Sequence, residues 1–165
     1  MANQQDTLFQ QVMREHGGML MRVAASFERD RHERNDLMQD IMLGLWQSLP
    51  SFRGEASLKT FVLAIAHRRC ASHVMQATRA PRHEELDEEW ACSQPSPEVR
   101  VGLSQQQEKL LAAVRELPVG QRQLVLLALE GMQYSEIAKL LDITESNVGV
   151  RLNRAKTALK AMMEK

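Results

Sequence analysis

The stretch EGMQYSEIAKLLDITESNVGVRLNRAKTALK, residues 130–160, has the layout of a helix-turn-helix. Apolar residues recur at helical spacing on both sides of a tight turn at residues 142–144. They are Ile137, Ala138, Leu141, Val148 and Leu152. The small Ala138 lets two helices cross closely, and Thr144 is a good N-cap for the second one. The spacing predicts one helix over about 134–141 and another over about 145–162.

The second of these helices is expected to expose hydrogen-bonding side chains at its start and cations further along. These are Glu145, Ser146, Asn147, Arg151, Arg154 and Lys156. A recognition helix needs the first kind for base edges and the second kind for phosphates. The alternative is a plain helical hairpin with a solvated charged face. We favour DNA binding because the small residue, the turn, the cap and the basic face coincide.

The composition of the whole chain predicts an all-α protein. Aromatic residues make up only 4% of the 165 residues, whereas aliphatic residues and Met are plentiful. No apolar run approaches the roughly 18 residues that a membrane span needs. The N-terminal sequence lacks the basic start and apolar core of a signal peptide, so we expect a cytoplasmic protein. Two cysteines do not make a disulfide framework.

The charge distribution divides the chain into two mildly basic halves and an acidic connector. The net charge is zero, but residues 81–100 hold six Asp and Glu against two Lys and Arg. Local patches, not the total, decide phosphate binding. The Pro-rich, acidic composition predicts a flexible linker. We therefore expect a helical domain at 1–77, a linker at 78–103 that contains Trp90 and Cys92, and a helix-turn-helix domain at 104–165.

Apolar periodicity predicts four helices before the linker and two more ahead of the helix-turn-helix. Gly17 and Gly18 are expected to separate the first two helices. On the third, Leu37, Ile41, Leu45 and Leu49 recur every four residues as a buried stripe. The expected ranges are about 6–15, 19–28, 33–49, 57–76, 104–116 and 118–130.

The spacing of His67, Cys70 and His73 argues against a zinc site. Steps of three residues turn the two histidines too far around a helix to share one ion. Cys70 is expected in the core, and no metal or other cofactor is predicted.

The C-terminal half resembles region four of bacterial RNA polymerase sigma factors. The motif residues are Leu117-Pro118, Gly131, Tyr134, Glu136-Ile137-Ala138, Val148, Arg151 and Arg154-Ala155. Three positions depart from the family pattern: Asp142 stands where Gly is usual, Gln133 where Ser or Thr caps the first helix, and Gly149 where many members carry Lys.

The N-terminal half resembles region two of the same family. Its motif residues are Asp36-Leu37-Met38-Gln39-Asp40, Trp46, Phe52 to Ser57, Phe61 and Ile65-Ala66. Response regulators share much of the C-terminal pattern, but they carry an α/β receiver domain instead. Two matching domains in this order identify the chain as similar to extracytoplasmic-function (ECF) sigma factors.

The resemblance implies three surfaces. The loop at 51–58 and the helix after it would hold the non-template strand of the −10 element through Phe52, Arg53, Lys59, Thr60, His67, Arg68 and Arg69. The recognition helix at 145–162 would read the −35 element. Asp36, Leu37, Gln39, Asp40 and Leu43 would dock on the clamp helices of the polymerase β′ subunit; the alternative for this face is a solvated surface. Phe61 could be a core residue instead of a base contact.

The implied function is that of a non-enzymatic initiation factor. It would bind core RNA polymerase through the β′ and β subunits, recognise promoter DNA and promote melting. An anti-sigma factor is a further implied partner. The alternative is a stand-alone helix-turn-helix transcriptional regulator.

Overall fold

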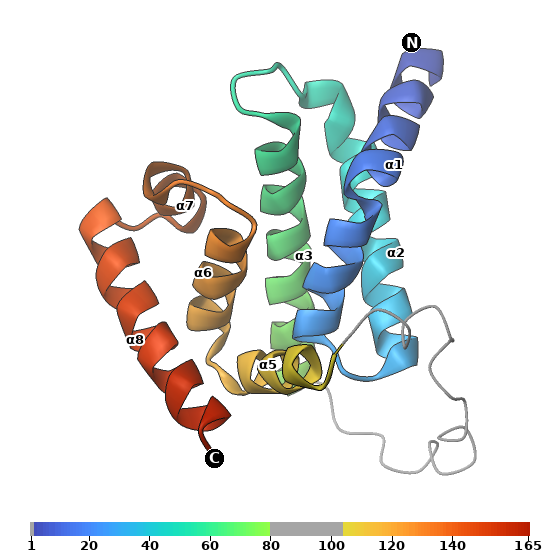
Figure 1. Ribbon diagram of the computed structural model, residues 1–165. Helices are drawn as coiled ribbons and strands as arrows, with labels where there is room; N and C mark the ends of the chain where they lie inside the picture. The colour runs from blue at the N-terminus through green and yellow to red at the C-terminus, as the bar shows by residue number, and fades with distance from the viewer. Residues whose placement is uncertain (1, 80–103) are drawn as a thin grey trace.

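The computed structural model describes residues 2–79 and 104–165, and these residues are helical with short connections (Figure 1). The helices are α1 (Ala2–Phe27), α2 (Arg31–Ser48), the 3-10 turn η1 (Leu49–Ser51), α3 (Leu58–Arg79), α5 (Gln105–Glu116), α6 (Val119–Leu129), α7 (Tyr134–Leu141) and α8 (Glu145–Met163). The all-α prediction is confirmed for this part of the chain. Trp90 and Cys92 lie outside the described residues. No described helix is long and apolar enough to cross a membrane.

The first helix differs from the sequence prediction. We expected a break at Gly17-Gly18, but α1 continues through both glycines. A glycine inside a helix costs only about 1 kcal/mol relative to alanine. Burial of Val12 ahead of the pair and of Leu20 and Val23 after it outweighs that cost.

Side-chain caps fix where several helices begin. Asp30 accepts a hydrogen bond from the backbone N–H of Glu33 at 3.1 Å and starts α2. Ser57 accepts one from the N–H of Thr60 at 3.1 Å ahead of α3. Ser104 and Gln107 form a reciprocal capping box at the start of α5. Each cap satisfies an N–H group that has no partner within its helix.

The buried stripe predicted for residues 37–49 is confirmed. Leu37, Ile41, Leu45 and Leu49 are at most 2% exposed. They belong to a hydrophobic cluster that α1, α2 and α3 build together. A second cluster joins α5, α6 and α8.

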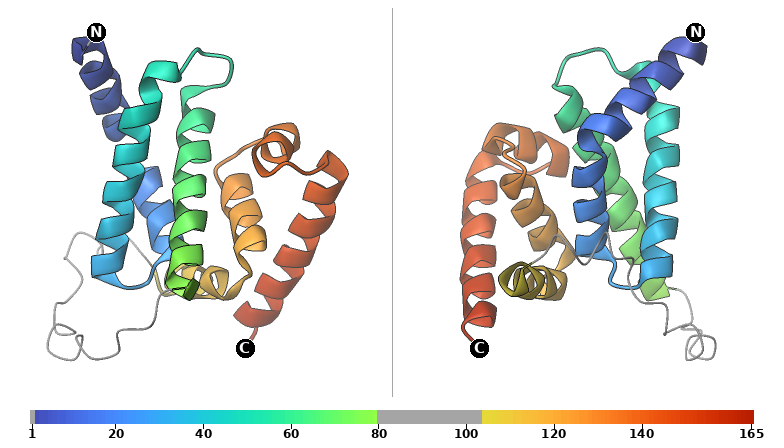
Figure 2. Two further views of the ribbon diagram at one scale, coloured as in Figure 1. Left: turned by 180° about the vertical axis from the view of Figure 1, so that it is seen from behind. Right: turned by 45° about the vertical axis from the view of Figure 1, so that its right-hand side comes forward.

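The larger cluster continues from the N-terminal helices into the C-terminal half. Leu124 and Leu127 of α6 and Ile137 of α7 belong to it, together with Leu20 and Leu63. The ribbon views place α6 beside α3, with α5 crossing near the C-terminal end of α1 and α8 on the outside (Figures 1 and 2). In this arrangement the two halves share one apolar core.

The turn between α7 and α8 has the geometry of a helix-turn-helix. Asp142 lies in the left-handed region, with φ 55° and ψ 50°. The N–H of Ile143 donates to the carbonyl of Ala138 at 3.0 Å and closes the end of α7. Leu152 and Val148 are buried on the inner side of α8, as the spacing predicted.

Candidate nucleic-acid interface

The predicted recognition helix presents its polar face to solvent. All six candidate side chains of α8 are exposed: Glu145, Ser146, Asn147, Arg151, Arg154 and Lys156. The Thr144 hydroxyl accepts a hydrogen bond from the N–H of Asn147 at 3.1 Å, so the first turn of α8 is held in place. The free side chains can reach a DNA groove without any rearrangement of α8.

The start of α7 is capped by a side chain within the helix and not by the residue that precedes it. The Gln133 side chain makes no capping hydrogen bond, but the backbone N–H of Gln133 donates to the Glu136 carboxylate at 3.2 Å. Gly149 of α8 lies near Tyr134: a Cβ at position 149 would be 3.7 Å from the Tyr134 ring. That distance is an ordinary contact, so the structure leaves room for a small side chain at position 149.

An aromatic pair forms at the loop that precedes α3. The rings of Phe52 and Phe61 lie 5.0 Å apart at 55°, and both are partly buried. Arg53 is exposed beside Gly54, which adopts φ 78°. Thr60 accepts a hydrogen bond from the Ser57 hydroxyl at 2.9 Å. The loop therefore combines a packed aromatic surface with a free cation.

The predicted cations along α3 lie in three different environments. Arg68 is exposed. The Arg69 guanidinium lies 3.0 Å from the Asp40 carboxylate. Lys59 donates to the carbonyl of Glu130 at 2.7 Å and lies 3.8 Å from its carboxylate. Of these, Arg68 is available to a nucleic-acid strand as the structure stands.

His67 differs most from its predicted role, because its side chain is fully buried. Neither ring nitrogen has a hydrogen-bond partner among the described residues. The His67 ring lies edge-on to the ring of Phe27, with 5.7 Å between the ring centroids. The Arg122 guanidinium of α6 lies over the same Phe27 ring. Burial lowers the pKa of His67 from 6.5 to about 4. In this arrangement His67 offers no surface to DNA.

The predicted polymerase-docking face on α2 is mostly exposed. Asp36 and Gln39 face solvent, and Leu43 is 51% exposed. The prediction is wrong for Leu37, which is 1% exposed because the i, i+4 stripe turns it into the core. Asp40 is half-exposed and holds Arg69.

Gly44 leaves room for the Arg69 guanidinium where it pairs with Asp40. A Cβ at position 44 would lie 2.6 Å from Nε of Arg69. Sequence reasoning did not find this requirement, since a lone glycine inside a helix carries no signal for which side chain crosses it.

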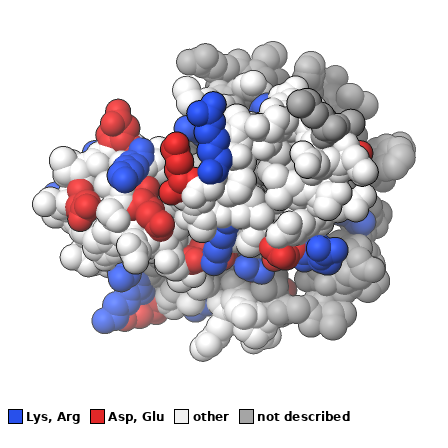
Figure 3. Space-filling model, turned by 90° about the horizontal axis from the view of Figure 1, so that it is seen from above, with Lys and Arg blue, Asp and Glu red and all other residues white. Residues whose placement is uncertain are grey.

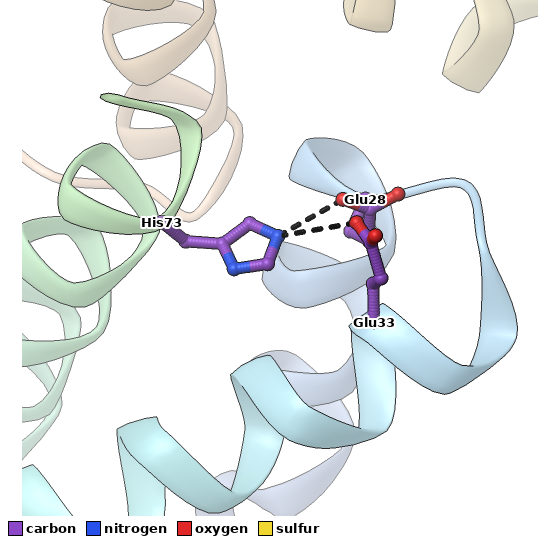
Figure 4. A group of neighbouring side chains, drawn as sticks. All are labelled: Glu28, Glu33 and His73. Atoms are coloured by element: carbon purple, nitrogen blue, oxygen red, sulfur yellow. Dashed lines mark hydrogen bonds and ion pairs between the residues drawn. The ribbon is translucent and has the colours of Figure 1, made fainter. Parts of the chain in front are cut away.

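A group of acidic and imidazole side chains joins the ends of three helices (Figure 4). Nε2 of His73 lies 2.9 Å from Glu28 and 4.0 Å from Glu33. Burial alone would raise the pKa of Glu28, but hydrogen bonds from His73 and from the backbone of Asp30 lower it. The hydrogen bond with Glu28 raises the pKa of Glu33. The three ligand atoms lie within 4.8 Å of one another, so this is the place where the described residues could hold a cation.

The contacts within this group are hydrogen bonds that join α1, α2 and α3. Oε1 of Glu28 already accepts the N–H of Asp30 at 3.0 Å, while Oε2 faces His73. Cys70 is buried, as its predicted place in the core implied, and burial raises its pKa to about 12.

Charge on the end of the molecule that carries the N-terminus is mixed. Lys and Arg side chains alternate there with Asp and Glu (Figure 3). No broad field of one sign covers this face, so binding of phosphate there must depend on individual cations.

Comparisons with known proteins show which family the chain belongs to. Residues 12–80 match the family described as Sigma-70 region 2, and residues 107–159 match Sigma-70, region 4. RNA polymerase sigma factor YlaC of Bacillus subtilis is 30% identical over 149 residues, which cover 84% of this chain and 83% of that one. This chain belongs to the sigma-70 family. The ECF RNA polymerase sigma factor SigM of Mycobacterium tuberculosis is 26% identical over 156 residues, which cover 94% of this chain and 76% of its own.

The fold is shared with solved sigma factors. RpoE of Bartonella quintana, in complex with the anti-sigma factor NepR, matches with a TM-score of 0.72 at 21% identity over 94% of this chain and 96% of that one. CnrH, in complex with the cytosolic domain of CnrY, matches with a TM-score of 0.67 at 20% identity over 96% of this chain and 89% of that one. The chain is thus an ECF sigma factor that initiates transcription, and sigma factors are non-catalytic polymerase subunits.

Proposed function

We propose that this sigma factor divides promoter recognition between its two halves. The exposed face of α8 binds the −35 element as duplex DNA. The loop before α3, together with α3, holds the non-template strand of the −10 element. The observation that carries the proposal is the fixed first turn of α8, where Thr144 caps a helix whose polar side chains all face solvent.

Promoter opening follows from preferential binding of the opened strand. Each base-pair step costs about 1.4 kcal/mol on average to separate. A protein without ATP can meet this cost only by binding the single strand better than the duplex. Aromatic surfaces accept unstacked bases, and cations hold the backbone. Phe52 and Phe61 supply the first, while Arg53 and Arg68 supply the second.

The exposed face of α2 docks on the β′ clamp of core polymerase, with further contacts to the β subunit. Asp36 and Gln39 are the polar contacts, and Leu43 is a large apolar side chain that is 51% exposed. An exposed leucine between polar residues suits the apolar centre of an interface that has a polar rim. Asp40 joins them through its half-exposed carboxylate.

An anti-sigma factor is a second protein partner in this proposal. Among the solved structures of similar fold, RpoE is in complex with the anti-sigma factor NepR, and CnrH is in complex with the cytosolic domain of CnrY. In this chain Leu129, Tyr134 and Val150 are large apolar side chains that remain at least 44% exposed in the C-terminal half. The protein would act in the cytoplasm, where polymerase and promoter DNA meet.

The test is transcription of genomic DNA by sigma-free core enzyme, with and without the purified chain, followed by sequencing of transcript 5′ ends. We expect new start sites that share one pair of −10 and −35 sequences. Arg154→Ala should reduce those transcripts, whereas Lys165→Ala, at the chain end, should not. A chain that binds duplex DNA tightly alone but adds no start site would instead be a stand-alone regulator.

A further inference from the structure

Three side chains from separate segments meet where α1 ends, where α2 begins and near the end of α3 (Figure 4). Glu28 follows the last residue of α1, Glu33 lies in the first turn of α2, and His73 belongs to α3. Nε2 of His73 is 2.9 Å from Oε2 of Glu28 and 4.0 Å from Oε2 of Glu33. One ligand atom from each residue lies within 4.8 Å of the other two. An imidazole nitrogen and two carboxylate oxygens therefore converge on one small volume.

The kinds of atom in this group are those of a transition-metal site. Neutral imidazole is the commonest metal ligand among protein side chains, and carboxylate oxygens accompany it in many zinc sites. A set of oxygens alone would suit Mg²⁺ or Ca²⁺, but the nitrogen of His73 favours a borderline ion such as Zn²⁺, Co²⁺ or Ni²⁺. The mixed set distinguishes this group from an ordinary patch of surface carboxylates.

The spacing of the three atoms suits an ion between them. Ligand atoms that each lie about 2.1 Å from one Zn²⁺ are roughly 3.4 Å apart in a tetrahedral site. The distance from His73 to Glu28 is shorter than this and the distance to Glu33 is longer. The Glu33 side chain is 58% exposed, so it is free to move towards the ion. For Nε2 to bind the ion, the imidazole proton has to sit on Nδ1, and the ion then replaces the hydrogen bond between His73 and Glu28.

Hydrogen bonds outside the group hold its ligands in place. Oε1 of Glu28 accepts the N–H of Asp30 at 3.0 Å, which leaves Oε2 directed at His73. The Asp30 carboxylate accepts the N–H of Glu33 at 3.1 Å and fixes the first turn of α2 beside Glu28. Outer hydrogen bonds of this kind orient the ligands of metal sites. Glu28 and His73 are 16% and 20% exposed, so the site is closed towards the protein and open to water on the side of Glu33.

The charge of the group also favours a cation. Two carboxylates that approach each other are stabilised when a proton or a metal ion lies between them. The hydrogen bond with Glu28 raises the pKa of Glu33, which is the effect that such a proton has. A divalent ion neutralises both carboxylates without protonation of Glu33.

We propose that Glu28, Glu33 and His73 form a binding site for a divalent transition-metal ion of the zinc class. The ion joins the end of α1, the start of α2 and α3 close to the point where α3 leads into residues 80–103. This inference goes beyond the proposed function, because neither DNA nor polymerase takes part in the site. The bound ion stabilises the N-terminal half, so the folded fraction of that half rises with the concentration of free metal.

The test is titration of the full chain with Co²⁺ and Zn²⁺ after treatment with EDTA and dialysis. We expect one ion per chain, with visible Co²⁺ absorption bands that Zn²⁺ abolishes. At about 100 times its Kd, Zn²⁺ should raise the Tm by roughly 5–10 °C. Glu33→Gln and His73→Gln should each weaken binding by about 100-fold or more. Circular dichroism should show unchanged helix content in Glu33→Gln, because this side chain is mostly exposed.

His16→Gln is the matched control. Nε2 of His16 lies 3.9 Å from Glu15, and among the described residues this pair belongs to no group of three ligands. The control should bind Zn²⁺ like the wild type. X-ray absorption at the zinc edge should find nitrogen and oxygen at about 2.0–2.1 Å, whereas a site made by the cysteines would show sulfur at about 2.3 Å.

Four results would each overturn the metal site. They are an unchanged Tm in Zn²⁺, equal Zn²⁺ affinity in the wild type and His73→Gln, sulfur bound to the zinc, and Mg²⁺ binding as tight as that of Zn²⁺. The last result would mean that the carboxylates attract cations without using the imidazole.

Discussion

The Arg69 guanidinium lies 3.0 Å from the Asp40 carboxylate and joins two surfaces with different proposed partners. Arg69 belongs to the helix proposed to hold the opened strand, and Asp40 belongs to the face proposed to dock on polymerase. The two residues are 34% and 43% exposed, so solvent screens their attraction. The pair therefore matters for the position of Arg69 more than for stability.

Gly44→Ala should reduce transcription without unfolding the protein. The added Cβ would lie 2.6 Å from Nε of Arg69 and displace its side chain from Asp40. Helix propensity gains up to about 1 kcal/mol from the same change, which offsets the lost contact. We expect a nearly unchanged urea midpoint and a drop in transcript yield like that of Arg69→Ala.

The matched control for this substitution is Gly120→Ala in α6. A Cβ there meets no atom within 4 Å. It should keep full transcription. If Gly44→Ala transcribes as well as wild type, the position of Arg69 does not matter for initiation.

The left-handed residue at the turn of the helix-turn-helix gives a second prediction. Asp142 has φ 55°, a conformation that costs most L-residues roughly 1–2 kcal/mol. Asp142→Gly should raise the free energy of unfolding by about 0.5 kcal/mol, because glycine adopts this region freely but loses more entropy on folding. Asp142→Ala should lower it. Urea unfolding of the three chains checks the order, and a less stable glycine variant would contradict it.

The buried His67 makes stability depend on pH. Its pKa is about 4 when folded and 6.5 when exposed, so the unfolded chain binds the proton more strongly. The contribution of His67 is unchanged above pH 6.5, falls as the pH drops from 6.5 towards 4, and levels off below that. The loss reaches about 3 kcal/mol if burial is complete.

His67→Leu isolates this effect. The variant should lose less stability than wild type between pH 6.5 and 5, where most carboxylates are still ionised. It should also be the more stable chain at pH 5, because no polar nitrogen is left buried without a partner. Parallel pH profiles for the two chains would show that His67 is not protonated on unfolding.

The recognition helix allows base contacts to be separated from phosphate contacts. Arg154→Ala should weaken binding of the polymerase complex to all −35 sequences alike. It should also reduce the slope of log binding constant against log salt concentration by about one, the value for one phosphate contact. Asn147→Ala, at the start of α8, should instead change which base pairs are preferred. Binding of a randomised −35 library at two salt concentrations distinguishes the two outcomes. If Arg154→Ala changed the base preference and Asn147→Ala weakened binding uniformly, α8 would lie in the groove in another orientation.

Sequence periodicity was sufficient for most of the fold. The boundaries of α7 agree with the prediction, and α8 ends one residue beyond it, because turn and cap chemistry is local. The same local reasoning failed at Gly17 and Gly18, where packing on both sides of the pair keeps α1 continuous.

The candidate site was predictable only where its residues remain exposed. The six side chains of α8 lie on an outer face that no other described helix covers, so their types and spacing were enough to predict them. His67 and Lys59 could not be placed in this way. Their environment depends on Glu130 and on α6, which lie more than fifty residues further along the chain. No periodic pattern encodes a contact between two halves that each have a regular helical pattern.

The central claim is that this sigma factor opens a chosen stretch of duplex with binding energy alone. Permanganate footprinting measures this directly, since it modifies unpaired thymines at a promoter found by transcript sequencing. With core polymerase and the chain, and without nucleotides, thymines of the −10 region should become reactive on both strands. Arg53→Ala combined with Arg68→Ala should suppress that reactivity while leaving polymerase binding intact. The account would be contradicted if the −10 thymines stayed unreactive while the chain is bound to polymerase and promoter. It would also be contradicted if core enzyme alone made them reactive.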